Sequence, residues 1–260
     1  LDALDNEIEI IADVDGDCTG EFPACPFYGM ARATSEDPPA IYSIQSTGGD
    51  IVETKISDIT DDSPGDSNYP NGLAFDDDND IWYFAEEDGT LKTLNEDGSL
   101  GEESYGVISP DDEPIAGASF HDGLYYFIPN GGDELWTADI SGGTADTDKV
   151  ADLDWSDIGL GDIAIDTDNE IAYVSTTDSN DGPVFFSIDL NDPSDQQPIA
   201  DGPDDEDAVG MQLAFENGTL WAHEAEGGDW YTVEKTDGSL SDVVETTGEY
   251  TDLAACGFAE

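Results

Sequence analysis

Positive charge is nearly absent from this sequence. Its 260 residues contain five Lys and Arg against 64 Asp and Glu, which gives a formal net charge of -59 at pH 7. Nucleic acids and anionic membranes bind proteins through cationic patches, so neither is expected as a partner. No apolar run approaches the roughly 20 residues that span a bilayer, so direct membrane insertion is not expected either.

Cysteine and histidine are also scarce. Cys18, Cys25 and Cys256 allow one disulfide and one free thiol. Cys18 and Cys25 bracket a short Pro-containing loop and are the favoured pair, although Cys256 could pair with either of them. A disulfide would favour an extracellular location. The sequence has no Ser-centred nucleophile elbow, P-loop, dinucleotide fingerprint or paired-His metal motif, so the commonest catalytic classes lack a signature.

The abundant carboxylates are spread over every loop and are not gathered in one tail. Hydrophobic residues still make up 37% of the chain, which is enough for a core and argues against disorder. In ordinary buffer this charge would repel itself, whereas at ~1 M salt the screening length falls to about 3 Å. The composition therefore indicates a folded protein adapted to molar salt, as haloarchaeal proteins are.

A repeat of about 45 residues organises the chain. Apolar triplets that follow Gly-containing turns end at positions 75, 120, 165, 215 and 258, so the copies are 45, 45, 50 and 43 residues apart. The triplets are Leu73–Phe75, Ala118–Phe120, Ile163–Ile165, Leu213–Phe215 and Cys256–Phe258. Each of the first four precedes a polar turn, two further strands and a more polar fourth strand. Four short strands per unit, without any helical periodicity, predict the blades of a β-propeller.

The two ends of the chain are predicted to share one blade. Phe27–Ala33, Ile41–Gln45 and Ile51–Ile56 resemble the second, third and fourth strands of a blade, and Leu253–Phe258 resembles a first strand. Joining them predicts an all-β, five-bladed β-propeller of four-stranded antiparallel blades. The C-terminal strand closes this ring by joining the N-terminal blade, which leaves no exposed edge there.

The predicted propeller domain spans residues 27–260, and residues 1–26 form an acidic N-terminal extension packed on it. A second interpretation uses Glu7–Ala12 as the inner strand of the shared blade and leaves the C-terminus elsewhere. We favour closure by the C-terminus, because Cys256–Phe258 falls on the period of the repeat.

One copy of the repeat is similar to a known family. Tyr69–Asp76 reads YPNGLAFD, and a turn and strand of sequence NDIWY follow it. This resembles NHL-type and gluconolactonase (regucalcin)-like propeller repeats, which carry P-x-G-apolar-A-apolar-D, an acidic turn and then an I-W/Y-V strand. The resemblance implies a propeller, and families with these repeats include lactonases, lyases and binding modules. In lactonase-like members a divalent metal lies in the central channel, and the nearest positions here are Asn71 and Asp162, each at the start of an inner strand.

An acidic segment before the first strand resembles part of a calcium loop. Asp13, Asp15, Asp17 and Glu21 alternate oxygen ligands in the way that a hard cation requires, so they are candidate calcium ligands. Cys18 replaces the glycine of the usual loop, and an acidic surface loop is the alternative interpretation. The Asp-rich turns between strands are predicted to be structural, because hairpin geometry itself favours Asp and Asn.

Candidate ligand-binding residues lie near the ends of the predicted inner and second strands. Tyr69 and Trp155 fall in the connections that lead into inner strands, where propellers commonly bind ligands, and Asn71 and Asp162 follow them. His223 ends a second strand at the same end and is expected at the surface, whereas His121 falls in a turn at the other end. Asn217-Gly218-Thr219 is both a glycosylation acceptor pattern and a good hairpin turn.

Three functions are consistent with these features. The first is a non-catalytic extracellular recognition or adhesion propeller, on a halophilic archaeon or an associated virus or filament, that binds a protein or a glycan. The second, implied by the resemblance, is a metal-dependent lactonase-like hydrolase or lyase. The third is an assembly subunit that pairs strand edges with its neighbours.

We expect stability to depend steeply on salt, because screening removes most of the repulsion within the acidic coat. The chain should unfold cooperatively in molar KCl and lose that transition after dialysis into millimolar salt, as followed by tryptophan fluorescence. A cooperative transition that survives desalting would contradict the halophilic interpretation.

Overall fold

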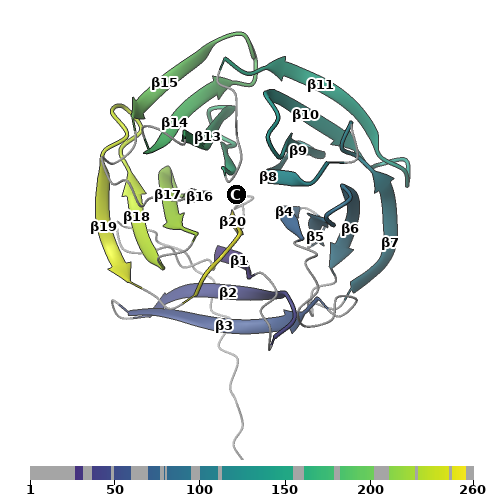
Figure 1. Cartoon of the computed structure of the whole chain (residues 1–260), viewed down its shortest axis with the longest axis horizontal. Coiled ribbons are helices and arrows are strands. Elements are labelled where there is room, and N and C mark those ends of the chain that lie inside the picture. The colour runs from purple at the N-terminus through teal and green to yellow at the C-terminus, as the bar shows by residue number, and fades with distance from the viewer. Residues whose placement is uncertain are drawn as a thin grey trace, which may run out of the picture.

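Twenty strands form the regular structure of the described residues, arranged as five four-stranded antiparallel sheets around one axis (Figure 1). The computed structural model describes residues 27–31, 37–47, 50–59, 70–76, 79, 81–94, 100–110, 113–154, 161–178, 182–201, 211–225, 228–245 and 248–255. No helix long and apolar enough to cross a membrane occurs in these ranges. The prediction of an all-β, five-bladed propeller is therefore confirmed.

Four blades are continuous in sequence, and in each the chain runs from the innermost strand to the outermost. Blade 1 contains β4 (Asn71–Asp76), β5 (Ile81–Ala85), β6 (Thr90–Leu94) and β7 (Leu100–Val107). Blade 2 contains β8 (Ile115–His121), β9 (Leu124–Pro129), β10 (Glu134–Asp139) and β11 (Asp146–Asp152). Blade 3 contains β12 (Ile163–Asp166), β13 (Ile171–Asp178), β14 (Gly182–Asp189) and β15 (Gln196–Asp201). Blade 4 contains β16 (Met211–Glu216), β17 (Thr219–Glu224), β18 (Asp229–Val233) and β19 (Leu240–Glu245).

Blade 5 combines the two ends of the chain, as predicted. It contains β20 (Asp252–Ala255), β1 (Phe27–Ala31), β2 (Ala40–Thr47) and β3 (Asp50–Asp58). Strand β20 pairs antiparallel with β1, and Leu253 lies opposite Gly29. Figure 1 shows β20 inside β1, β2 and β3, next to the axis. The C-terminal strand therefore closes the ring, while the alternative strand Glu7–Ala12 lies outside the described residues.

The predicted register of the closing strand is wrong by three residues. Leu253 lies opposite Gly29 of β1, just as Ile163 lies opposite Val174 of β13 in blade 3. Leu253 is therefore the first residue of the apolar triplet, which is Leu253–Ala255 and not Cys256–Phe258. The last repeat is shorter than the others, since its triplet ends 40 residues after that of blade 4 (215 to 255). Residues 256–260 lie outside the described part of the chain.

The burial of each strand follows its distance from the axis. Strand β12 is buried at all four positions, whereas the outer strand β11 alternates between exposed and half-buried residues. A bulge interrupts the pairing of the third strand with the fourth in all five blades. Bulges twist an outer strand and make it a poor template for pairing with another chain. The acidic half of each repeat thus supplies turns and rim, and the apolar half supplies the inner strands.

The hydrophobic core is divided among the five seams between neighbouring blades. Each buried cluster joins side chains from two adjacent blades. The seam of blades 5 and 1, for example, packs Met30 and Ile41 with Leu73 and Trp82. No blade has a core of its own, so each depends on its neighbours for burial.

Blades 2 and 3 approach most closely at Gly117. A Cβ added there would lie 2.5 Å from the Asp162 Cα, closer than carbon atoms pack. We predict that Gly117→Ala destabilises the protein by about 2 kcal/mol or more, the range of overpacking substitutions. Gly142→Ala is the matched control, because its added Cβ meets no heavy atom nearer than 3.9 Å. Thermal unfolding in molar KCl measures both, and equal midpoints would contradict this packing of the two blades.

Candidate functional site

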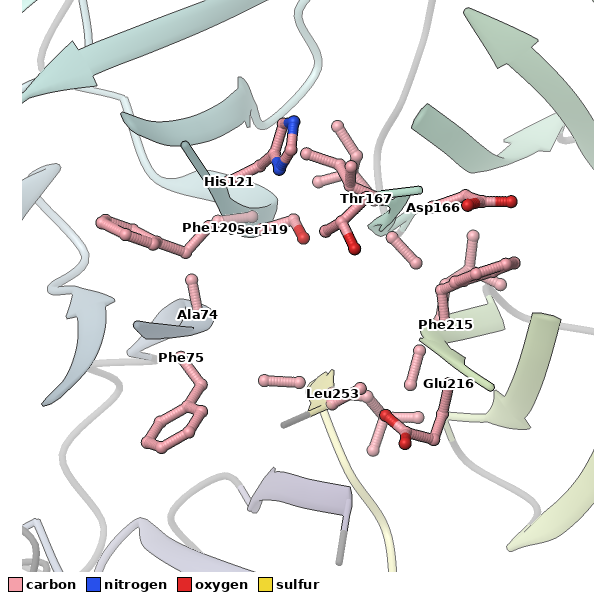
Figure 2. Close-up of a pocket in the computed structure, with 18 of the residues that line it drawn as sticks. Ala74, Phe75, Ser119, Phe120, His121, Asp166, Thr167, Phe215, Glu216 and Leu253 are labelled. Carbon is pink, nitrogen blue, oxygen red and sulfur yellow. The ribbon is translucent and has the colours of Figure 1, made fainter. Parts of the chain in front are cut away.

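A cavity of about 650 Å³ opens along the propeller axis (Figure 2). Its wall comes from the inner strands of all five blades, and its mouth from the turns that join first and second strands in blades 2, 3 and 4. Described residues from every blade meet around this open space, so it is the candidate binding site.

Small side chains form the wall of this cavity. The middle residue of each inner-strand triplet lines it, and four of the five are alanine: Ala74, Ser119, Ala164, Ala214 and Ala254. The Ser119 and Thr167 hydroxyls face the open centre in Figure 2. A ligand group entering the cavity would therefore meet methyl groups and two hydroxyls, which suits a small polar group without a strong charge.

Aromatic rings stiffen the wall from behind. Phe120 stacks on Tyr83 with ring centroids 5.4 Å apart, and Phe215 stacks on Tyr173 at 5.7 Å. The Lys235 ammonium lies 4.9 Å from the centre of the Phe215 ring. Figure 2 shows the Phe75 and Phe120 rings directed away from the centre. These rings therefore hold neighbouring blades together and leave the cavity open.

Carboxylates and one histidine follow the triplets at the mouth. Asp76, Asp166 and Glu216 are buried, with exposed fractions of 3%, 2% and 4%, and His121 occupies the same repeat position. Asn79 Nδ2 donates to the Asp76 carboxylate at 2.8 Å, and Asn169 donates to the Asp166 carboxylate from both its backbone and its side chain. As predicted, acids in these turns satisfy hairpin geometry. Among the described residues no three His, Cys, Asp or Glu side chains form a metal-binding group.

The opposite end of the inner strands is held by a buried polar network. Asn71 Nδ2 donates to the Ile115 and Ala116 carbonyls at 3.1 and 2.6 Å, which joins blade 1 to blade 2. Asp162 accepts hydrogen bonds from the Ile163 and Leu213 backbone N–H groups at 2.7 and 2.8 Å, which joins blade 3 to blade 4.

Asp252 closes this network between blades 5 and 1. Its Oδ2 accepts hydrogen bonds from the Gly72 and Leu73 backbone N–H groups at 2.5 and 3.0 Å. The Tyr125 hydroxyl donates to the Gly72 carbonyl at 2.5 Å. We call Asn71, Asp162, Asp252 and these partners the axial network. Asn71 and Asp162, which the family resemblance placed near a channel metal, therefore serve as hydrogen-bonding groups between blades.

His223 is buried, so the expectation of a surface histidine there is wrong. Its side chain has no exposed area, and its ring lies 4.7 Å from Trp230 and 5.1 Å from Tyr250, centroid to centroid. Burial lowers the pKa of His223 to about 4, with the Gly248 backbone offsetting part of that effect. Tyr250, two residues before β20, packs over this histidine, which the position of His223 near the end of β17 did not reveal.

Several predicted site residues lie outside the described residues. They are Tyr69, Trp155, the candidate calcium ligands Asp13, Asp15, Asp17 and Glu21, and all three cysteines, Cys18, Cys25 and Cys256. Asn217 is described: it is exposed and adopts φ 49° before Gly218 at φ 77°, the two positive values of a tight hairpin turn. The prediction of a hairpin turn there is confirmed, and glycosylation stays a prediction.

Sequence reasoning missed Ser119 and Asp252. A signal for Asp252 exists, because Asp252-Leu253-Ala254 repeats the pattern of Asp162-Ile163-Ala164. Aligning these two tripeptides would also have placed the closing strand in its correct register. Ser119 is the one polar residue among the five wall positions, which becomes meaningful only once the strands are arranged around an axis.

Comparison with solved structures supports the fold. A crystal structure of a nidogen/laminin complex matches with a TM-score of 0.57 at 13% identity, over 84% of this chain and 77% of that chain. The C-terminal WD40 domain of Sif2 matches with a TM-score of 0.42 at 14% identity, over 85% of this chain and 59% of that one. No protein-family model and no curated protein matches the sequence. The similarity to the nidogen/laminin structure shows the β-propeller fold alone.

We predict that acid destabilises the protein partly through His223. The pKa of His223 is lower in the folded than in the unfolded chain, so this contribution to stability is complete above about pH 6.5 and is lost as the pH falls towards 4. The shift corresponds to about 3 kcal/mol. His223→Leu should remove this difference between pH 6.5 and 4, measured as denaturant midpoints in molar KCl.

His121→Leu is the control for this titration, because His121 is half-exposed at the cavity mouth. It should keep the acid dependence of the parent protein. If His223→Leu also kept that dependence, the buried and neutral state of His223 would be refuted.

Proposed function

We propose that this chain is a non-catalytic recognition propeller that binds a protein ligand at the mouth of its central cavity. The observation that carries the proposal is the cavity of about 650 Å³ walled by all five blades. Cavities of this size with a few convergent polar groups are the usual form of a binding site.

The distribution of ionisable groups supports binding over catalysis. Asp162, Asp252 and His223 have strongly shifted pKa values, which is often a mark of catalytic groups. All three are fully buried and are absent from the cavity lining. The groups that do line it are hydroxyls, aliphatic and phenylalanine side chains, the carboxylates of structural turns, and His121, which is half-exposed at the mouth.

The mouth favours ligands that carry hydrogen-bond donors. Asp122 and Asp168 are exposed at its edge, and the described residues that line the cavity include no lysine or arginine. Donors such as lysine, arginine or amide groups of a protein ligand would pair with these carboxylates, whereas phosphate and sulfate would be repelled. The nidogen/laminin structure is a complex of proteins, and it supports a protein ligand through shared fold alone. A glycan with many hydroxyl donors is the second ligand class.

We further propose that the protein works outside a halophilic archaeal cell, on its surface or on an associated virus or filament. The acidic composition, the favoured Cys18–Cys25 pair and the acceptor pattern at Asn217 support this setting. The resemblance of Tyr69–Asp76 to NHL-type and gluconolactonase-like repeats supports a relationship to those propeller families. The acidic loop at residues 13–21 supports the binding of a calcium ion in that loop.

We predict that blocking the cavity abolishes recognition. Ser119→Trp fills the space beside the wall, whereas Ser141→Trp alters an exposed turn of the same blade, between β10 and β11. Binding of the labelled protein to halophilic archaeal cells and to a glycan array, in molar KCl, should weaken at least about tenfold for Ser119→Trp. Ser141→Trp should bind like the parent.

Equal binding by the two variants would contradict a cavity-centred site. Lactone hydrolysis that requires a divalent metal would contradict the non-catalytic assignment and favour the lactonase-like alternative. A rise in mass with concentration in light scattering, without binding to cells, would favour the assembly subunit.

A further inference from the structure

Two carboxyl groups of the axial network are buried where the inner strands converge. Asp162 and Asp252 both have no exposed area, and their side chains contact each other. The ion pairs of the described residues involve other carboxylates: Asp58, Glu86, Glu134, Asp152 and Asp166. Two ionised carboxylates in contact, away from water and without a cation, would repel each other strongly.

The hydrogen bonds of the two carboxyl groups differ, and the difference indicates which of them carries a proton. Both oxygens of Asp162 accept backbone N–H groups, Oδ1 from Ile163 and Oδ2 from Leu213. Asp252 accepts the Gly72 and Leu73 N–H groups on Oδ2, and the Leu253 backbone lies beside both carboxyl groups. Asp252 Oδ1 is buried and accepts no hydrogen bond. An acceptor without a donor in a buried site is costly, whereas a hydroxyl at the same position can donate to the neighbouring carboxylate.

The surroundings favour a single negative charge on the pair. Strands β4, β16 and β20 present backbone N–H groups to it, and β8 presents Gly117. The titratable group of β9 that faces the pair is Tyr125, whose hydroxyl donates to the Gly72 carbonyl and is therefore neutral. Burial raises the pKa of both carboxyl groups, and the Asp162 charge raises the pKa of Asp252 further, so Asp252 holds the proton of the pair.

We propose that Asp252 is a carboxylic acid in the folded protein and that its Oδ1–H donates to the Asp162 carboxylate. This hydrogen bond helps to hold the ring closed and is lost when the pH rises. Asp252 is the first residue of β20, the strand that completes blade 5, and it binds β4 of blade 1 through Oδ2. The bond to Asp162 ties the same residue to blade 3. When Asp252 loses this proton to solvent at alkaline pH, the two adjacent carboxylates repel, and the link between β20 and blade 3 is lost.

The sign of the pH effect follows from the direction of the shift. The folded protein binds this proton at pH values where the unfolded chain, with ordinary Asp groups, has released it. The stabilisation is therefore complete below about pH 4, the ordinary pKa of Asp, and declines as the pH rises from there to the raised pKa of Asp252. One proton changes the unfolding equilibrium constant by up to about tenfold per pH unit within this window.

Asp252→Asn tests the proposal directly, because an amide can copy the acid. Its oxygen can accept the Gly72 and Leu73 N–H groups, while its NH₂ replaces the Oδ1–H and donates to Asp162. We expect this variant to fold and to lack the pair's pH dependence. Between pH 5 and pH 7, the ratio of the parent's unfolding constant to that of the variant should rise roughly 100-fold in molar KCl.

Asp162→Asn is the matched opposite change. Both Asp162 oxygens accept backbone N–H groups, so one NH₂ would face a donor, and this variant should lose stability at every pH. Asp76→Asn, a buried acid at the other end of an inner strand, should keep the pH dependence of the parent. Infrared spectroscopy at neutral pH should show a protonated-carboxyl C=O band in the parent that disappears in Asp252→Asn.

Two results would overturn the proposal. One is destabilisation by Asp252→Asn equal to that of Asp162→Asn, with no carboxylic acid band in the parent. The other is stabilisation of the parent by millimolar calcium that EDTA reverses and that Asp252→Asn abolishes, since a cation and not a proton would then lie between the carboxylates.

Discussion

Closure of the ring by β20 is the constraint on which the rest of this structure depends. Each hydrophobic cluster lies in a seam between two blades, so a missing inner strand would expose two seams at once. Strand β20 supplies Ala254 to the seam with blade 1 and Leu253 to the seam with blade 4. Without its four residues, the other nineteen strands would leave the ring open next to the axis. The cavity exists for the same reason, because five inner strands around one axis leave a space that small side chains do not fill.

The chain uses its carboxylates in two distinct ways. At the rim and in the turns they are solvated, and their mutual repulsion is tolerable when salt screens it. At the axis they are buried, and there they serve as acceptors for backbone N–H groups that no strand pairing satisfies. In the axial network, Asp, the most abundant residue type of the sequence, therefore connects blades through hydrogen bonds. This arrangement separates the stabilising acids at one end of the channel from the binding cavity at the other.

The sequence predicted the parts of the fold that depend on local pattern. Alternating apolar residues and turn signals located strands within a few residues: the predicted strand Phe27–Ala33 begins with β1, and Ile41–Gln45 lies within β2. The five-blade count followed from the period. The register of β20 was missed because the last repeat is shorter, so the period pointed to Cys256–Phe258 when the shared Asp-Leu/Ile-Ala pattern pointed to Asp252.

The candidate site was less predictable, because it depends on contacts between distant residues. Asp252 binds Gly72 across 180 positions, and no local pattern encodes that pairing. His223 reads as a solvent-facing strand end until Tyr250 covers it. The most direct test of ring closure is amide hydrogen exchange of Gly72, Leu73 and Leu253 in molar KCl. If β20 closes the ring, these amides exchange only with global unfolding, as slowly as the Leu213 amide in blade 4. Exchange orders of magnitude faster than that of Leu213 would show that the ring is open at this seam.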